Sequence, residues 1–343
     1  MELDARKLRI LAAITETYLA TGEPVGSKLI AAMLGGEVSP ATVRNDMAVL
    51  FDMGLLEQPH TSAGRIPSHH GLRIFVDRLM KSQPLTVNER QEIDALFNRR
   101  NPDPDRLLED AAKALADYTN CAAISTSLYK QSAYVRKIEL IPAASRTVVI
   151  LLIASNGMIK NKVCRVDFNL LPKIVEFFTN FANSRLAGRG INEITAEYIN
   201  SMSCSLEEYA DIFTPLLTAI YELCREASDG RIYYSGESNL LEYDELRQVA
   251  NQLFRVLDNR DEMMSIIEKD KQNMGVSIGR ENQRMEFNDS SVIISRYKIG
   301  EDSMGAIGLI GPVRMDYARL IPHLEYFSQM LGKLITDTLN EQE

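Results

Sequence analysis

One short segment near the N-terminus carries side chains that can read DNA bases. Ser39 and Pro40 are typical of a helix start, since serine caps free N–H groups and proline tolerates the first helical position. We expect Val43, Met47 and Leu50 to form the buried face of this helix. The opposite face then presents Thr42, Arg44, Asn45 and Ala48. Arginine can bind guanine, asparagine can bind adenine, and threonine and alanine can contact thymine methyls, so the segment is a candidate DNA-reading helix.

A basic hairpin is expected directly after this helix. Weak alternation at 55–60 and the segment 65–67 predict two short strands, and 61–64 contains typical turn residues. Residues 60–81 include four basic side chains and one acidic one, which leaves a net charge of +3. Arg65 would lie at the hairpin tip, where its side chain could enter a minor groove. The alternative interpretation is a plain capped surface helix followed by a solvated charged loop.

A small helical unit must position these residues. Periodic apolar residues predict helices at 5–20, at 27–34 with Ser27 as N-cap, from 40 onward, and at 68–81. Three helices followed by a hairpin and a further helix describe a winged helix-turn-helix, in which one helix enters the major groove. The candidate DNA contacts are Ser27, Lys28, Ser39, Thr42, Arg44, Asn45, His60, Thr61, Ser62, Arg65 and Arg73.

The charge of the chain is distributed unevenly. The 343 residues have a formal net charge of −9, which by itself argues against a nucleic-acid ligand. Residues 1–81 carry nine basic and nine acidic side chains, so the excess acidity lies entirely in 82–343. DNA would repel that acidic part, and we therefore expect docking through the N-terminal unit alone.

Composition and motifs argue against several other classes of protein. The longest purely apolar run, 148–154, has seven residues, whereas a membrane-spanning helix needs about 20. The charged N-terminus lacks a signal core and the four cysteines are widely separated, so we expect a cytoplasmic protein without a membrane partner. We expect no metal or cofactor, because the histidines at 60, 69 and 70 lack a cysteine partner. We expect no enzyme, because hydrolase and P-loop motifs are absent and only His323 lies beyond residue 81.

Beyond residue 81 the pattern is that of an α+β protein. Helices are expected within 84–100, 105–118, 171–228, 243–257, 261–270 and 315–340. Strands are expected at 122–127, 135–141, 148–154, 162–166, 231–234, 275–279, 292–297 and 305–310. Gly305, Gly308 and Gly311 do not have the spacing of a nucleotide-binding loop, and we interpret them as strand positions that another segment approaches closely.

Two stretches at opposite ends of the chain resemble one protein family. They are SPATVRNDMAVLFDMGLLEQPHTSAGRIPSHHGLRIFVD at 39–77, and SIGRENQRMEFNDSSVIISRYKIG followed by GAIGLIGPVRMDYARLIPHLEYFSQML within 277–331. Both are similar to the HrcA family of bacterial heat-inducible transcription repressors. The chain departs from the family pattern at Leu72, where an aromatic residue is expected after Gly71.

The resemblance implies a three-part architecture and a function. The parts are a winged-helix DNA-binding domain at 1–81, a GAF-like domain from 105–135 and 229–343, and an inserted dimerisation domain at 136–228. A linker helix at 82–104 connects the first two. The implied function is repression of chaperone operons by a dimer that binds an inverted-repeat operator and releases it on heat stress. The chaperonin is implied as the partner that keeps the repressor active.

An inverted repeat requires a two-fold dimer, so residues beyond 81 must supply an interface. The apolar helical patterns at 172–186 and 206–226 contain the candidates Phe177, Phe178, Phe181, Phe213 and Leu217. The alternative is that these side chains form the core of their own domain. A different function also remains open: a ligand-gated transcription regulator that uses the GAF-like domain as a small-molecule sensor.

Overall fold

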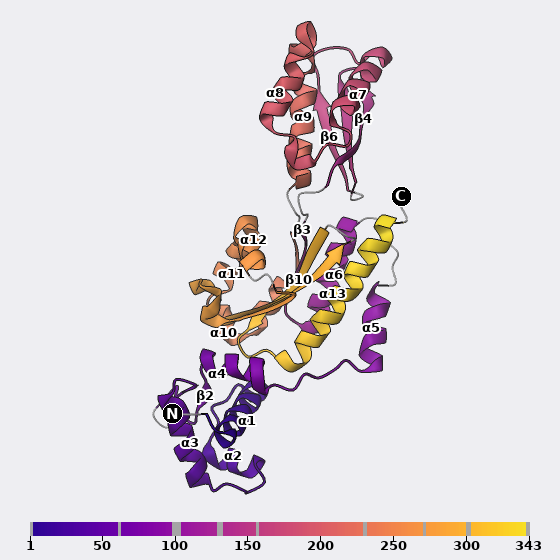
Figure 1. Cartoon of the computed structure of the whole chain (residues 1–343). Helices are drawn as coiled ribbons and strands as arrows, with labels where there is room; N and C mark the ends of the chain where they lie inside the picture. The colour runs from indigo at the N-terminus through magenta and orange to yellow at the C-terminus, as the bar shows by residue number, and fades with distance from the viewer. Residues whose placement is uncertain are drawn as a thin grey trace.

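The computed structural model describes residues 3–60, 63–97, 104–128, 133–155, 158–228, 232–269, 272–299 and 303–340. Figure 1 shows three lobes in an elongated arrangement, with the N-terminal helices at one end, a three-stranded lobe at the other, and a five-stranded sheet between them. Among the described residues, no helix is both long and apolar enough to cross a membrane.

The N-terminal lobe is mainly helical. Its elements are α1 (Ala5–Thr21), α2 (Ser27–Met33), α3 (Pro40–Asp52), β1 (Leu56–Glu57), β2 (Ile66–Pro67) and α4 (His69–Ile74). Asp4 accepts a backbone N–H at the start of α1, and Gly22 ends that helix with φ 73°, a conformation that glycine adopts without steric cost. The first three helices pack together around Ile14, Ile30 and Leu50, which are fully buried.

Several predicted elements are longer than the observed ones. The helix expected at 68–81 consists of α4 and one π-helical turn, Phe75–Leu79, after which Met80 is extended. The strand expected at 55–60 is only β1. The helix expected at 243–257 is divided into α10 (Asp244–Arg247) and α11 (Ala250–Asp258). Tertiary packing, which local periodicity does not encode, sets these ends.

The middle lobe is a five-stranded antiparallel sheet in the order β7-β3-β10-β9-β8. Its strands are β3 (Ala122–Leu128), β7 (Ile232–Ser235), β8 (Met274–Ile278), β9 (Ser290–Ile299) and β10 (Ser303–Pro312). Its helices are α5 (Val87–Phe97), α6 (Pro104–Thr119), α10, α11, α12 (Arg260–Lys269) and α13 (Tyr317–Asn340). Ile293 packs in the cluster with α6 and α13, and Ile294 packs in the cluster with α11 and α12. Helices cover both faces, which explains why the central strands read as continuous apolar runs.

Glycines let the central strands approach their neighbours. A Cβ at Gly308 would lie 2.8 Å from the carbonyl oxygen of Ile293, and a Cβ at Gly305 would lie 2.3 Å from the Tyr297 ring. A Cβ at Gly311 would lie 2.6 Å from the sulfur of Met315. The interpretation of these glycines as positions of close approach is confirmed.

The third lobe is inserted between two adjacent strands. β3 and β7 pair directly, for example Ile124 with Tyr234, although the residues of the third lobe separate them in sequence. That lobe contains β4 (Val135–Ala144), β5 (Thr147–Ala154), β6 (Ile159–Arg165), α7 (Pro172–Leu186), α8 (Ala196–Cys204) and α9 (Ala210–Ser228). Its sheet has the order β4-β5-β6, as the predicted meander requires, and Asn183 of α7 bonds to both the N–H and the carbonyl of Ile138.

Candidate nucleic-acid interface

The start of α3 is fixed by its predicted cap. Ser39 accepts the N–H of Thr42 at 3.1 Å, and the two hydroxyl oxygens lie 2.9 Å apart. Pro40 occupies the first helical turn, where its missing N–H leaves no hydrogen bond unmade. Ser39 and Thr42 therefore serve the helix start, and the Ser39 side chain remains exposed.

The inner face of α3 is anchored by an ion pair that the sequence pattern did not reveal. Val43, Met47 and Leu50 are buried, as predicted. Asp46 is buried beside them and accepts two hydrogen bonds from Arg6 of α1, at 2.8 and 3.1 Å. The hydrogen bond to Asp46 raises the pKa of Arg6. The sequence contained one signal for this pair, because an acidic residue within the apolar stripe of a helix needs a partner when it is buried.

The outer face of α3 carries two polar side chains that are free to bind a ligand within the described structure, Arg44 and Asn45. Arg44, Asn45 and Ala48 are exposed, and Thr42 is half-buried. Within the part of the chain that the structure describes, Arg44 and Asn45 form no ion pair or hydrogen bond through their side chains. The adjacent guanidinium and amide share this face with the smaller side chains of Thr42 and Ala48, so they can approach a groove of DNA directly.

The start of α2 differs from the prediction. The N-cap is Gly26, and no side chain caps the helix, so the assignment of Ser27 as N-cap was wrong. Ser27 is the first helical residue and is half-buried, whereas Lys28 is exposed. α2 packs on α3, and both lie on the side of the lobe away from the five-stranded sheet (Figure 1). Lys28 is therefore the cation of α2 that remains available to a phosphate.

The hairpin is tied to the segment that precedes α2. Val25 and Arg65 exchange two backbone hydrogen bonds of 2.9 Å each. A Cβ at Gly64 would lie 2.4 Å from the carbonyl oxygen of Val25, so only glycine permits this approach. The β1–β2 ladder itself pairs Leu56 with Pro67 and Glu57 with Ile66.

The predicted position of Arg65 at the hairpin tip was wrong. Its backbone is in the bridge to Val25, and its guanidinium lies 4.9 Å from the ring centroid of Phe51 at the end of α3. Cation–π contact of this kind stabilises the local packing. His60 is exposed nearer the tip. Thr61 and Ser62 lie outside the described residues.

Arg73 faces the middle lobe rather than the candidate interface. Its Nε donates to Glu281 at 2.9 Å, its Nη1 to Asp77 at 3.2 Å, and its Nη2 to the carbonyl of Val276 at 2.5 Å. Four of its five N–H donors are bonded within the chain, which argues against the phosphate contact that the basic segment suggested. The pairing partner is 208 residues away in the sequence, and therefore invisible to local pattern reasoning.

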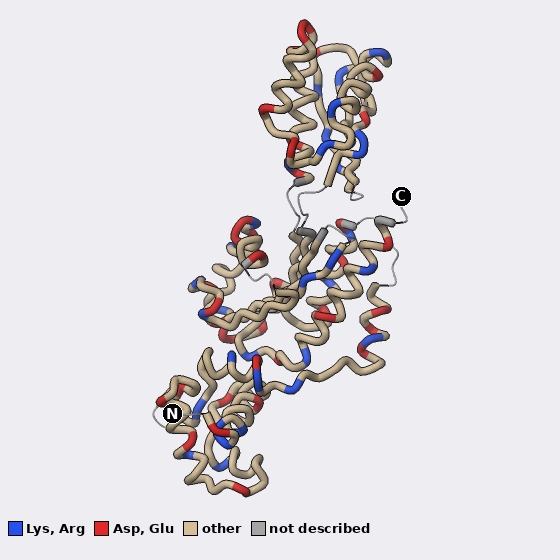
Figure 2. The backbone as a smooth tube through the Cα atoms, in the orientation of Figure 1, with Lys and Arg blue, Asp and Glu red and all other residues tan. Residues whose placement is uncertain are grey.

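Ion pairing explains how a neutral lobe can present cations. Arg6 binds Asp46, Lys7 binds Asp4, and Arg9 binds Glu37. Figure 2 shows both signs of charge in the N-terminal lobe. In the described residues, Lys28 and Arg44 have no such acidic partner, so they remain as cations on α2 and α3.

Three of the five candidate interface residues lie in the core of the inserted lobe. Phe178, Phe213 and Leu217 are no more than 3% exposed, and the rings of Phe178 and Phe213 stack with centroids 4.9 Å apart. Their assignment to a dimer interface was wrong, because both α7 and α9 use these residues to cover the sheet. Phe177 is 50% exposed and Phe181 is half-buried.

An apolar surface surrounds Phe177. A hollow of about 340 Å³ is lined by Phe168, Lys173, Ile174, Phe177, Tyr209, Ile212 and Phe213. Leu171, Tyr209 and Ile212 are 58%, 56% and 42% exposed. We refer to Leu171, Ile174, Phe177, Tyr209 and Ile212 as the apolar patch.

Known proteins resemble the chain over its whole length. Residues 105–321 match the family model described as the HrcA protein C-terminal domain. The heat-inducible transcription repressor HrcA of Clostridium acetobutylicum is 36% identical over 324 residues, which is 94% of each chain. The protein of the same name from Thermoanaerobacter pseudethanolicus is 35% identical over 349 aligned positions, which cover 100% of each chain.

A solved structure shares the fold. A crystal structure described as that of a hypothetical protein has a TM-score of 0.68 and 23% sequence identity, and the match covers 98% of this chain and 100% of that one. The two full-length relatives are repressors by name, and the family model matches more than half of the chain. The resemblance found in the sequence is thereby confirmed, and the chain belongs to the HrcA family of heat-inducible transcription repressors.

Proposed function

We propose that this chain represses transcription by binding double-stranded DNA through the outer face of α3. The observation that carries the proposal is that the inner face of α3 is held rigidly, while two polar side chains on its outer face remain available to a ligand. The Ser39 cap and the Arg6–Asp46 pair fix the helix, while Arg44 and Asn45 have no partners within the described chain. Arg44 and Asn45 would contact base edges, and Lys28, Ser39 and His60 would contact phosphates.

The domain organisation belongs to the same proposal. Residues 1–81 would form a winged-helix DNA-binding domain, connected by a linker helix within 82–104. Residues 105–135 and 229–343 would form a GAF-like domain, and 136–228 would form the inserted dimerisation domain. The direct pairing of β3 with β7 supports an insertion between them.

A homodimer on an inverted-repeat operator completes the proposal. Two α3 helices related by a two-fold axis would occupy half-sites separated by a fixed number of base pairs. The apolar patch supports an interface between two copies, because exposed aromatic and aliphatic residues clustered on one surface are typical of protein–protein contacts. Phe177 and Tyr209 would be its centre, since large aromatic side chains contribute most to such interfaces.

The DNA-binding proposal is tested with an inverted-repeat operator duplex over a salt series. If Arg44 contacts a base, Arg44→Ala should weaken binding by about 1–3 kcal/mol and relax specificity at one base pair. Arg9→Ala is the matched control, because Arg9 is also exposed but pairs with Glu37. Binding by Arg44→Ala with wild-type affinity and specificity would contradict the assignment.

The dimer proposal is tested by sedimentation of the full chain. Phe177→Ser should shift the equilibrium from dimer toward monomer. Val87→Ser, which changes a 71% exposed apolar residue of α5, should leave the equilibrium unchanged. A Phe177→Ser chain that remains fully dimeric at the lowest measurable concentration would remove the apolar patch from the interface.

Heat release and chaperonin support are also part of the proposed function. Heat would separate the two copies and expose the apolar patch, and a chaperonin would bind such exposed apolar surface. Operator binding by the purified chain should therefore fall after a heat pulse and recover faster when chaperonin and ATP are present. Binding that persists unchanged through the pulse without chaperonin would contradict this part.

A further inference from the structure

The two sequence segments that carry the family resemblance meet at one junction. Arg73 and Asp77 come from the end of the first segment, and Glu281 comes from the beginning of the second. In the structure, α4 packs against β8, which brings the N-terminal and middle lobes together. This contact involves neither the outer face of α3 nor the apolar patch.

Arg73 and Glu281 form the central interaction of the junction. The guanidinium engages both carboxylate oxygens of Glu281, and also donates to the carbonyl of Val276 at 2.5 Å. Glu281 also accepts the N–H of Ile278 at 2.8 Å, which fixes the carboxylate on the turn after β8. Burial alone would raise the pKa of Glu281, but the hydrogen bonds from Arg73 and Ile278 hold it below its usual value. The planar, two-point geometry specifies orientation as well as attraction.

Beside this pair, Gly279 of the middle lobe lies close to His69 of α4. Gly279 has φ +53°, and a Cβ there would lie 2.2 Å from the imidazole of His69. The positive φ favours glycine, and a Cβ would also lie 2.7 Å from the backbone carbonyl oxygen of Asn288, which cannot turn aside as a side chain can. His69 and Arg73 lie one turn apart on α4, so this helix touches the middle lobe at two successive points.

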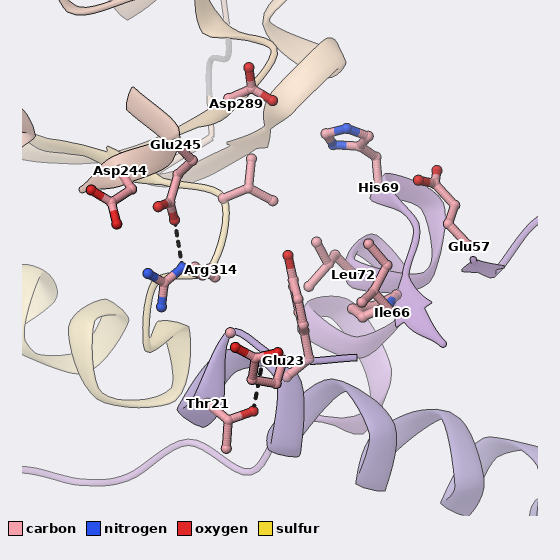
Figure 3. A pocket seen from close by; sticks show the side chains of 14 residues that line it. Thr21, Glu23, Glu57, Ile66, His69, Leu72, Asp244, Glu245, Asp289 and Arg314 are labelled. Atoms are coloured by element: carbon pink, nitrogen blue, oxygen red, sulfur yellow. Dashed lines mark hydrogen bonds and ion pairs between the residues drawn. The ribbon is translucent and has the colours of Figure 1, made fainter. Parts of the chain in front are cut away.

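A polar hollow occupies the rest of the junction. It has a volume of about 540 Å³ and is lined by residues that include Glu23, Glu57, Asp244, Glu245 and Asp289. Figure 3 shows Arg314 on its far side, bonded to Glu245 at 2.5 Å. A Cβ at Gly22 would lie 3.3 Å from the guanidinium of Arg314. The lobes therefore touch at the rims of this hollow, where Leu72 packs into the apolar core of the middle lobe and charged contacts add a preferred orientation.

We propose that the Arg73–Glu281 pair is a latch that sets the orientation of the N-terminal lobe, and that a dimer needs this latch to place both α3 helices on an inverted repeat. The inference rests on the proposed function. Arg73 acts as a positioning residue through Glu281 and does not touch DNA. A lobe released from the latch still binds one half-site, but two released lobes no longer have a fixed separation.

Operator binding separates positioning from DNA contact. Arg73→Gln and Glu281→Gln should each weaken binding to the full inverted repeat by at least about tenfold. Both should bind a single half-site duplex like wild type, with an unchanged salt slope, whereas a lost phosphate contact would flatten that slope by about one unit. The double variant should be no weaker than the weaker single variant, because the two residues act through one interaction. Arg78→Gln, which removes an exposed cation five residues further along, is the matched control.

Three binding outcomes would overturn the latch. The first is wild-type affinity of Arg73→Gln for the full repeat. The second is an equal loss on half-site and full repeat, which would mean that Arg73 contacts DNA or merely supports folding. The third is a loss in Arg73→Gln that Glu281→Gln does not share.

Proteolysis tests the latch independently of DNA. The residues at 81–84 are exposed, so a lysine-specific protease can cleave after Lys81. Cleavage of the native chain should be faster by about fivefold or more in Arg73→Gln and Glu281→Gln, and unchanged in Arg78→Gln. Unchanged cleavage in both latch variants would overturn the proposal. If wild type failed to bind any inverted repeat, the proposed function would fail, and the cleavage result would still decide the latch.

Discussion

The two lobes at the ends of the molecule present opposite kinds of surface. In the N-terminal lobe, acidic residues pair with Arg6, Lys7 and Arg9, whereas Arg44 and Asn45 on the outer face of α3 have no side-chain partner among the described residues. In the inserted lobe, the exposed residues of α7 and α9 include large apolar ones. A polar, cationic surface suits a polyanion, and an apolar surface suits a second protein surface. The difference fits the proposed division of work, in which one lobe would bind DNA and the other would join two copies.

The largest expected effect separates surface from core within the inserted lobe. Phe178 is fully buried and stacks on Phe213, so Phe178→Ala should lower the free energy of unfolding by about 3–5 kcal/mol. Phe177→Ala should cost much less in unfolding and should instead weaken dimer formation. Denaturant unfolding at several protein concentrations separates the two effects, because dimer stability depends on concentration. Equal losses in unfolding free energy for both variants would contradict the assignment of Phe178 to the core and Phe177 to the surface.

The next largest effect is expected at the ion pair that anchors the inner face of α3. Asp46→Ala removes both hydrogen bonds to Arg6 and should lower stability by about 1–2 kcal/mol. Glu37→Ala, which breaks the exposed pair with Arg9, should change stability by less than about 0.5 kcal/mol. Thermal unfolding of both variants provides the measurement. Equal shifts would show that Asp46 does not anchor α3.

A smaller effect is expected at the start of α3. Ser39→Ala removes the side chain that accepts the N–H of Thr42 and should cost about 1 kcal/mol. Ser39→Asp should retain the cap, because a carboxylate accepts the same hydrogen bond, but it should weaken operator binding by repelling phosphate. The pair of variants thus separates capping from DNA contact. Parallel losses of stability in both variants would contradict the capping role.

The smallest effect is expected in α5. Hydrogen bonds from the backbone and side chain of Thr86 are the main cause that lowers the pKa of Glu89 from its ordinary 4.5 to about 2. The depressed pKa means that this carboxylate stabilises the fold above pH 4.5 and that its contribution is lost as the pH falls toward about 2. Glu89→Gln should remove that part of the acid dependence, measured as the free energy of unfolding between pH 2 and pH 6. A profile identical to that of wild type would contradict the interpretation.

Local periodicity predicted the parts of the fold that depend on nearby residues. The buried face and the cap of α3, the meander of the inserted lobe and the glycine positions of β10 all follow from neighbouring sequence and are confirmed. Adjacent Phe177 and Phe178 could not be separated by type, because the sheet beneath α7 decides which one points inward. The partner of Arg73 could not be inferred either, since Glu281 reaches it only through the packing of two lobes.

Operator isotherms of Phe177→Ser and Arg44→Ala test the division of work most directly. They are measured on an inverted-repeat duplex and on the same duplex with one half-site scrambled. If the two lobes divide the work in this way, Phe177→Ser loses the advantage of the full repeat but keeps half-site affinity. Arg44→Ala should remain dimeric and bind both duplexes more weakly. Wild-type binding of the full repeat by a monomeric Phe177→Ser chain, or wild-type binding of both duplexes by Arg44→Ala, would contradict the division of work between the lobes.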